Sequence, residues 1–189
     1  MELCMRNDEA DLFKSVLDKS EGYFEYGCGG STVYAANNTS AKIHTIDSMQ
    51  EWIDKIKDVI GDRADILYDR VDVGPTKDYG MPVDRSNASN WPAYSDGIFR
   101  CSFIPDTVMI DGRFRVACCL KTIKYFHEKQ DELNPTILFH DITRPGFEPA
   151  FMFLDTVQKV NELGCFKIKQ TLDINEVDEL ITKHELNPG

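Results

Sequence analysis

A short aromatic segment that runs into a cluster of glycines is the feature that most restricts the fold of this chain. Residues 22–26 read Gly-Tyr-Phe-Glu-Tyr, and glycines follow at Gly27, Gly29 and Gly30. Glycine adopts positive φ at little cost and lets a ligand come close to the backbone. The segment from Ser31 onward can open a helix, whose first N–H groups and dipole attract polar ligands. A strand, a glycine turn and a helix N-terminus together predict a nucleotide pocket.

Strand and helix patterns alternate along the rest of the chain. Strands are expected at residues 23–26, 42–47, 65–73, 106–111, 136–141 and 165–170, and helices at 11–18, 31–36, 48–60, 114–129, 147–163 and 177–184. Ser48 with Glu51 three residues later predicts a capped helix start. This alternation predicts a doubly wound, mostly parallel α/β sheet in a three-layer αβα sandwich. No antiparallel pair is expected after the sixth strand, so the sheet is predicted to be truncated there.

Length and charge limit the classes of function. The 189 residues are expected to form one domain (1–189), in which residues 76–95 form a long loop or lid. Trp91 and Tyr94 in this loop either close over a ligand or anchor the loop to the core. The net charge of −11 argues against a nucleic-acid partner. No apolar run reaches the ~18 residues of a membrane span, and an acidic N-terminus without an apolar signal core favours a cytoplasmic protein.

An acid placed two residues before the first glycine separates two nucleotide cofactors. The dinucleotide fingerprint G-x-G-x-x-G fits Gly27 and Gly29, but its third glycine falls on Thr32. Glu25 suits a ligand that carries an ammonium group and no phosphate, and S-adenosylmethionine (SAM) is such a ligand. An NAD-dependent oxidoreductase is therefore the weaker of the two alternatives.

The glycine turn resembles a known motif. Glu25-x-Gly27-x-Gly29-Gly30-Ser31 is similar to motif I of the class I SAM-dependent methyltransferases, with Ser31 in place of the third glycine of that pattern. Asp47 ends the second strand 20 residues after Gly27, where this family has the acid that binds the ribose. The strand ends Asp111-Gly112 and Phe139-His140-Asp141 resemble the small O-methyltransferase-like branch. The resemblance covers residues 20 to 170 and implies a Rossmann-like, class I methyltransferase fold.

The resemblance also implies two adjoining sites. Glu25 would favour the ammonium end of SAM, the backbone of 27–30 would lie under its methionyl part, and Asp47 would bind the ribose. The expected cofactor-binding residues are Glu25, Gly27, Cys28, Gly29, Gly30, Ser31, Asp47, Ser48, Asp72 and Val73. The catalytic candidates Asp111, His140 and Asp141 would face the methyl acceptor, with His140 as the base.

Metal-dependent members of that branch use an acid after the fourth strand and an Asp-Asn pair after the fifth. Asp111 and Asp141 match the two acids, but Ile142 stands where Asn is required, so a divalent metal is not expected. Arg113, Arg115 and Arg144 follow the same strand ends and either bind an anionic acceptor or pair with neighbouring acids.

These observations predict a SAM-dependent methyltransferase that methylates an oxygen of a small molecule, with an anionic acceptor as one option. A protein that keeps the fold to bind a cofactor or partner, without catalysis, is the alternative from another class. The sequence leaves the oligomeric state open, with a homodimer among the options.

Overall fold

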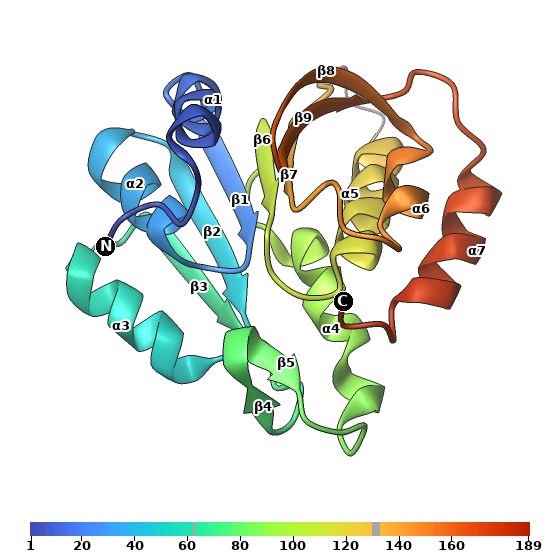
Figure 1. Ribbon diagram of the computed structural model, residues 1–189, viewed down its shortest axis with the longest axis horizontal. Helices are drawn as coiled ribbons and strands as arrows, with labels where there is room; N and C mark the ends of the chain where they lie inside the picture. Colours follow the sequence, from blue (N-terminus) through green and yellow to red (C-terminus); the bar gives the residue numbers. More distant parts are fainter. Residues whose placement is uncertain (62, 130–132) are drawn as a thin grey trace.

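A seven-stranded sheet with the order β3-β2-β1-β6-β7-β9-β8 forms the middle layer of the molecule (Figure 1). The computed structural model describes residues 1–61, 63–129 and 133–189. Strands β3 to β7 in this order are parallel, and β9 is antiparallel to both of its neighbours. The strands are β1 (Gly22–Tyr26), β2 (Lys42–Asp47), β3 (Ile66–Arg70), β6 (Thr107–Ile110), β7 (Thr136–His140), β8 (Leu154–Val160) and β9 (Leu163–Ile168). Chain order reverses between β1 and β6, which makes their carboxyl ends a switch point for ligands.

Helices cover both faces of the sheet (Figure 1). One layer contains α1 (Asn7–Leu17), α2 (Gly30–Asn38) and α3 (Gln50–Ile60), and the other contains α4 (Pro92–Ser95), α5 (Arg115–Lys129), α6 (Glu148–Phe151) and α7 (Ile174–His184). All of β1 is buried, as expected of a central parallel strand. Tyr23 packs under α1 and α2, while Phe24 and Tyr26 pack into the opposite core. The predicted α/β fold, doubly wound in three layers, is confirmed.

The last part of the sheet differs from the sequence prediction. Only Glu148–Phe151 is helical within the predicted helix 147–163, and β8 and β9 form an antiparallel pair in place of a truncated edge. The pair was not predicted because β8 lies at the edge of the sheet, where the residues between Leu154 and Val160 are exposed on both faces. Such a strand lacks the two-residue alternation of a half-buried one, and a bulge between Thr156 and Gln158 shifts its register further.

The segment expected to be a long loop contains short elements at the carboxyl end of β3 (Figure 1). They are β4 (Thr76–Lys77), η1 (Asp78–Gly80), β5 (Met81–Pro82), η2 (Ala88–Asn90), α4 and then η3 (Asp96–Arg100). Trp91 and Tyr94 are 2% and 1% exposed, and the indole N–H of Trp91 donates to the carbonyl of Val73 at 2.9 Å. Both aromatics therefore anchor the segment to the core, and its role as a lid stays a prediction. Within the described residues, no helix combines the length and apolar character needed to cross a bilayer.

Two turns meet where β1 and β6 end. Gly27 has a φ of 95°, and a Cβ built on it would lie 2.6 Å from the Cα of Gly112. A Cβ built on Gly112 would lie 2.1 Å from the hydroxyl of Tyr94. Side chains are thus excluded at both turns, and the backbones of the two central strand ends touch.

Replacing Gly27 with Ala is expected to destabilise the fold more than the left-handed backbone alone requires. Gly146 is a matched control, because its φ is 94° and no described atom lies within 4 Å of its Cβ position. Gly146→Ala is expected to cost about 1 to 2 kcal/mol, and Gly27→Ala about 1 to 3 kcal/mol more for the steric clash. Urea unfolding of the two variants measures the difference, and equal losses would contradict the close approach of the two turns.

Candidate functional site

The carboxylate of Glu25 is completely buried beneath the glycine turn. It accepts hydrogen bonds from the hydroxyls of Tyr23 at 2.9 Å, of Ser31 and Thr32 at the start of α2, and of Thr45 on β2 at 3.4 Å. Thr32 in turn accepts from the amide of Gly29 at 2.9 Å. The direct contact with a ligand ammonium group that the sequence implies for Glu25 is therefore not the contact it makes: both of its oxygens bind hydroxyls of the protein. Its position orders the turn and the first residues of α2.

Burial raises the pKa of Glu25 from its ordinary 4.5 to about 7, although the hydrogen bonds from Ser31, Thr32 and Tyr23 act in the opposite direction. The group thus titrates near neutral pH, because the hydroxyl donors offset only part of the cost of burying a carboxylate.

Asp47 lies at the end of β2 with its carboxylate beside the turn. Its Oδ2 accepts from the amide of Cys28 at 3.1 Å and its Oδ1 from the amide of Met49 at 2.9 Å. Burial raises its pKa, and these amide hydrogen bonds oppose the rise. From α3, the indole of Trp52 donates to the carbonyl of Cys28 at 2.6 Å. The thiol of Cys28 also donates to Oδ2, at 3.6 Å, so Oδ1 is the oxygen of Asp47 with a further lone pair for a ligand hydroxyl.

The glycines of the turn serve different purposes. A Cβ on Gly30 would lie 2.1 Å from the carbonyl oxygen of Glu2, so this glycine makes room for the N-terminal segment. Gly27 makes room for Gly112, as described above. At Gly29, by contrast, no described atom lies within 4 Å of the Cβ position. Gly29 is therefore the glycine that leaves the backbone open to a ligand.

Three further residues expected at the cofactor have mainly local roles. The predicted helix cap at Ser48 is wrong, because Met49 is the residue directly before α3. The hydroxyl of Ser48 instead donates to the carbonyl of Gly80 at 3.4 Å. The carboxylate of Asp47 accepts from the amide of Met49 in an Asx turn and so caps the chain just before the helix.

Asp72 is exposed and accepts from the amide of Gly74, while Val73 is buried. The predicted role of Asp72 and Val73 in cofactor binding stays a prediction.

The structure brings the three catalytic candidates together at the ends of β6 and β7. Nδ1 of His140 lies 3.3 Å from Asp111 Oδ1 and 3.6 Å from Asp141 Oδ1. Arg115, whose side chain is 5% exposed, contacts each of the two carboxylates at 3.0 Å. It also donates to the carbonyls of Gly112 at 3.0 Å and His140 at 2.7 Å. Arg115 therefore joins the two strand ends through their acids and their backbones.

This geometry does not suit His140 as a base. Nδ1 faces Asp111 and Asp141, and Nε2 lies 3.6 Å from Glu9 Oε2 of α1, buried and without a hydrogen-bond partner in the described part of the chain. Burial alone would lower the pKa of His140, but the hydrogen bond to Asp111 and the charges of Asp111 and Asp141 raise it. The pKa of Asp111 is lowered by the same hydrogen bond and by Arg115, against the effect of burial. An imidazolium that neutralises three acids fits the site better than a proton acceptor.

The same cluster does not fit a divalent cation. One ligand atom from each of Asp111, His140 and Asp141 lies within 4.8 Å of the others. However, the guanidinium of Arg115 contacts both carboxylates and supplies the positive charge that a metal would supply. A hard cation needs several free oxygen ligands, and Ile142 adds none.

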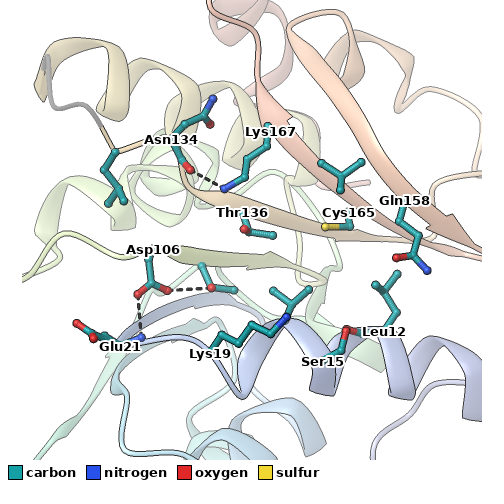
Figure 2. A pocket seen from close by; sticks show the side chains of 14 residues that line it. Leu12, Ser15, Lys19, Glu21, Asp106, Asn134, Thr136, Gln158, Cys165 and Lys167 are labelled. Carbon is teal, nitrogen blue, oxygen red and sulfur yellow. Dashed lines mark hydrogen bonds between the residues drawn. The ribbon is translucent and has the colours of Figure 1, made fainter.

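A separate cavity of about 490 Å³ lies at the amino ends of the central strands, away from the candidate site (Figure 2). It is lined by α1, by the first residues of β6 and β7 and by β8 and β9, with Lys19, Thr136 and Lys167 among its side chains. Asp106 in this cavity accepts from the amides of Glu21 and Gly22 and so fastens the start of β1. None of the predicted site residues lies there.

Several residues that shape the site were not predicted. Glu9, Trp52 and Thr45 come from α1, α3 and β2, and only the fold brings them to the site. Tyr23 could have been found, because it precedes Glu25 by two residues on the same strand and must share its face. Thr32 was noticed only as the position of a missing glycine.

Neither a protein-family model nor a curated protein matches this chain. Solved structures do match. A methyltransferase-like protein from Silicibacter pomeroyi is 28% identical, with a TM-score of 0.83 over 100% of this chain and 98% of its own. The N-methyltransferase NodS from Bradyrhizobium japonicum, in complex with S-adenosyl-L-homocysteine (SAH), is 13% identical, with a TM-score of 0.51 over 86% of each chain.

An RNA methyltransferase from Salinibacter ruber, also in complex with SAH, is 11% identical, with a TM-score of 0.50 over 90% of this chain and 97% of its own. The chain thus has the fold of the class I SAM-dependent methyltransferases, as its sequence predicts.

The raised pKa of Glu25 predicts a pH dependence of stability. Since the folded state binds the proton more tightly than the unfolded state, this contribution is fully present below about pH 4.5 and is lost as the pH rises through 7. From about pH 4.5 to 8 the free energy of unfolding of the wild type should fall by up to about 3 kcal/mol relative to Glu25→Gln, at about 1.4 kcal/mol per pKa unit. Urea unfolding at several pH values tests this, and parallel profiles would contradict it.

Arg115 is expected to be essential to the fold of the site, whereas Arg144 is not. Arg115→Met leaves two carboxylates without their buried partner and should cost about 3 to 5 kcal/mol. Arg144 also pairs with Asp141, at 2.6 Å, but its side chain is 45% exposed, so Arg144→Ala should cost less than about 1 kcal/mol. Chemical unfolding compares the variants, and similar losses would show that Arg115 does not carry the cluster.

Proposed function

We propose that this protein is a SAM-dependent methyltransferase that binds SAM across the carboxyl ends of β1 and β2. The observation that carries the proposal is the turn after β1, where the backbone at Gly29 is open and Asp47 of the next strand lies beside it. The similarity to two methyltransferase structures in complex with SAH supports the choice of cofactor.

Gly29, Asp47 and Glu25 are each proposed to have a separate role in binding SAM. Gly29 lets the methionyl part approach the backbone, and the start of α2 offers N–H groups at the same place. Asp47 uses the remaining lone pair of Oδ1 for a ribose hydroxyl. Glu25 holds Ser31 and Thr32 and so keeps the turn in its binding conformation. When bound, SAM supplies a methyl group on a sulfonium, which is already activated for transfer.

The acceptor is proposed to be an oxygen of a small molecule. Asp111 and Asp141, with side chains 30% and 25% exposed, line the edge beside the cofactor turn. The acidic balance of the chain disfavours RNA, because phosphate contacts need a concentrated basic surface. The enzyme's contribution to such a transfer is mainly to position the acceptor against the methyl group. An acceptor oxygen that is already ionised needs no base, which agrees with a site where both ring nitrogens of His140 face carboxylates.

A second candidate function is cofactor binding without catalysis. It is favoured by the contacts of Asp111 and Asp141, since Arg115 and His140 neutralise both acids and neither is then free to deprotonate a neutral hydroxyl. This candidate predicts that the protein binds SAH but transfers no methyl group.

Calorimetric titration with SAH tests the shared part of both candidates. We expect wild-type protein to bind SAH at micromolar concentrations, and Asp47→Asn to weaken binding about 10- to 100-fold, since hydrogen bonds to a charged group contribute about 1.5 to 3 kcal/mol. Asp54→Asn is the matched control, because Asp54 lies exposed on α3 and accepts only from Gln50 among the described residues. Absence of binding to the folded wild type at millimolar SAH would refute the proposal.

Incubating the protein with SAM and a panel of phenols, hydroxy acids and amines separates the two candidates. SAH formation that depends on one acceptor class, and is reduced in Asp47→Asn, would establish methyl transfer. Binding of SAH with no turnover across the panel favours the second candidate.

A further inference from the structure

Arg113 differs from the other arginines of the candidate site. Arg115 pairs with Asp111 and Asp141, and Arg144 pairs with Asp141. Arg113 has no carboxylate within ion-pair distance in the described ranges of the chain. Its Nε is buried and has no hydrogen-bond partner among the same residues. Buried donors are almost always satisfied, so this one indicates an acceptor that the described residues do not supply.

No carboxylate of the described residues pairs with the charge of Arg113. Burial and then the positive charge of Arg115 lower its pKa; Tyr94 opposes this shift, Arg144 adds to it, and Asp111 opposes it least. Asp111 is already held by Arg115 and His140. An anion that reached the guanidinium of Arg113 would therefore not compete with Asp111 for it.

The backbone amides of Arg113 and Phe114 are engaged within the protein, so an anion here would be held by the side chain of Arg113. The amide of Arg113 donates to the hydroxyl of Tyr94 at 3.4 Å, and Phe114 follows with a φ of 55° before α5 begins. The amide of Phe114 donates to the carbonyl of Pro188 at 3.2 Å, so the C-terminal residues line this place. The first turn of the 15-residue helix α5 adds the positive end of its dipole.

The position of Arg113 relative to the cofactor turn suggests which molecule brings the anion. Gly112, the residue before it, touches Gly27 of that turn. Because Arg113 follows a residue that borders the cofactor turn, a group bound to it is expected near the proposed SAM site.

We propose that Arg113 binds the anionic group of the methyl acceptor, a carboxylate or a phosphate. A guanidinium offers Nε and one Nη to two oxygens of such a group at once, which fixes its orientation as well as its position. The anion site stands on the geometry of Arg113, and its assignment to the acceptor rests on the proposed function.

NMR of protein labelled with ¹⁵N-arginine tests the anion site directly. Inorganic phosphate and benzoate are titrated separately, with chloride holding the ionic strength constant. We expect a saturable shift of the Nε–H resonance of Arg113, assigned with Arg113→Lys, at millimolar concentrations of one or both anions. The two titrations distinguish phosphate from carboxylate. No saturable shift with either anion up to about 50 mM would overturn the proposal.

Thermal unfolding gives a second measure that does not depend on assignment. The anion that shifts the resonance should stabilise the wild type and Lys42→Gln, but neither Arg113→Gln nor Arg113→Lys should gain as much. Lys42 is the matched control, because it is exposed and is the first residue of β2, at the amino ends of the strands, whereas Arg113 lies at their carboxyl ends. Equal stabilisation of all four proteins would mean that the anion binds elsewhere and would also overturn the proposal.

A titration of the wild type with SAH separates this proposal from the proposed function. Anion binding at Arg113 without SAH binding would refute the methyltransferase and the assignment to an acceptor, and would leave the anion site intact. SAH binding without anion binding would refute only the role of Arg113. Where both bind, acceptors that carry a carboxylate should be methylated at least 10-fold more efficiently than their methyl esters, and Arg113→Gln should remove this preference.

Discussion

The buried carboxylate of Glu25 is the contact on which the proposed cofactor site depends. It ties the end of β1 to the start of α2 through Ser31 and Thr32, while Thr45 links it to β2. A carboxylate at this depth is costly unless hydroxyls solvate it. Because every donor comes from an element that borders the turn, the cost of burial is offset only when the turn has its native shape. The open backbone at Gly29 is therefore a property of the whole strand, turn and helix unit.

The acceptor side is held together by charge instead of hydroxyls. Arg115 reaches across from α5 to the acids that end β6 and β7, and it binds the backbone carbonyls beside them. Asp141 has a φ of 62° there, a conformation that is uncommon outside glycine. The two halves meet at Gly27 and Gly112, where the absence of side chains lets the turns touch. A side chain added at either glycine would therefore displace both turns.

The sequence predicted the parts of the fold that depend on local pattern. Buried strands such as β1 and β7 and the glycine turn have signatures within a few residues. The edge strand β8 has none, because its side chains face solvent on both sides and a bulge interrupts its register. The grouping of Asp111, His140 and Asp141 followed from the rule that parallel strands end at one edge. What these residues do to one another could not follow from that rule, since it depends on Arg115 and Glu9, which arrive from other elements.

The excess of acidic residues in the chain makes an arginine without an ion pair at this edge informative. With a net charge of −11, carboxylates outnumber basic side chains in this chain. Arg115 and Arg144 have formed ion pairs within the described structure, and their charges serve the fold. Arg113 has not, although Asp111 is two residues away, because Arg115 and His140 already hold that acid. Among the arginines described at this edge, Arg113 is therefore left without an ion pair. An unpaired cation at a buried edge destabilises the free protein, and binding an anion there would relieve that cost.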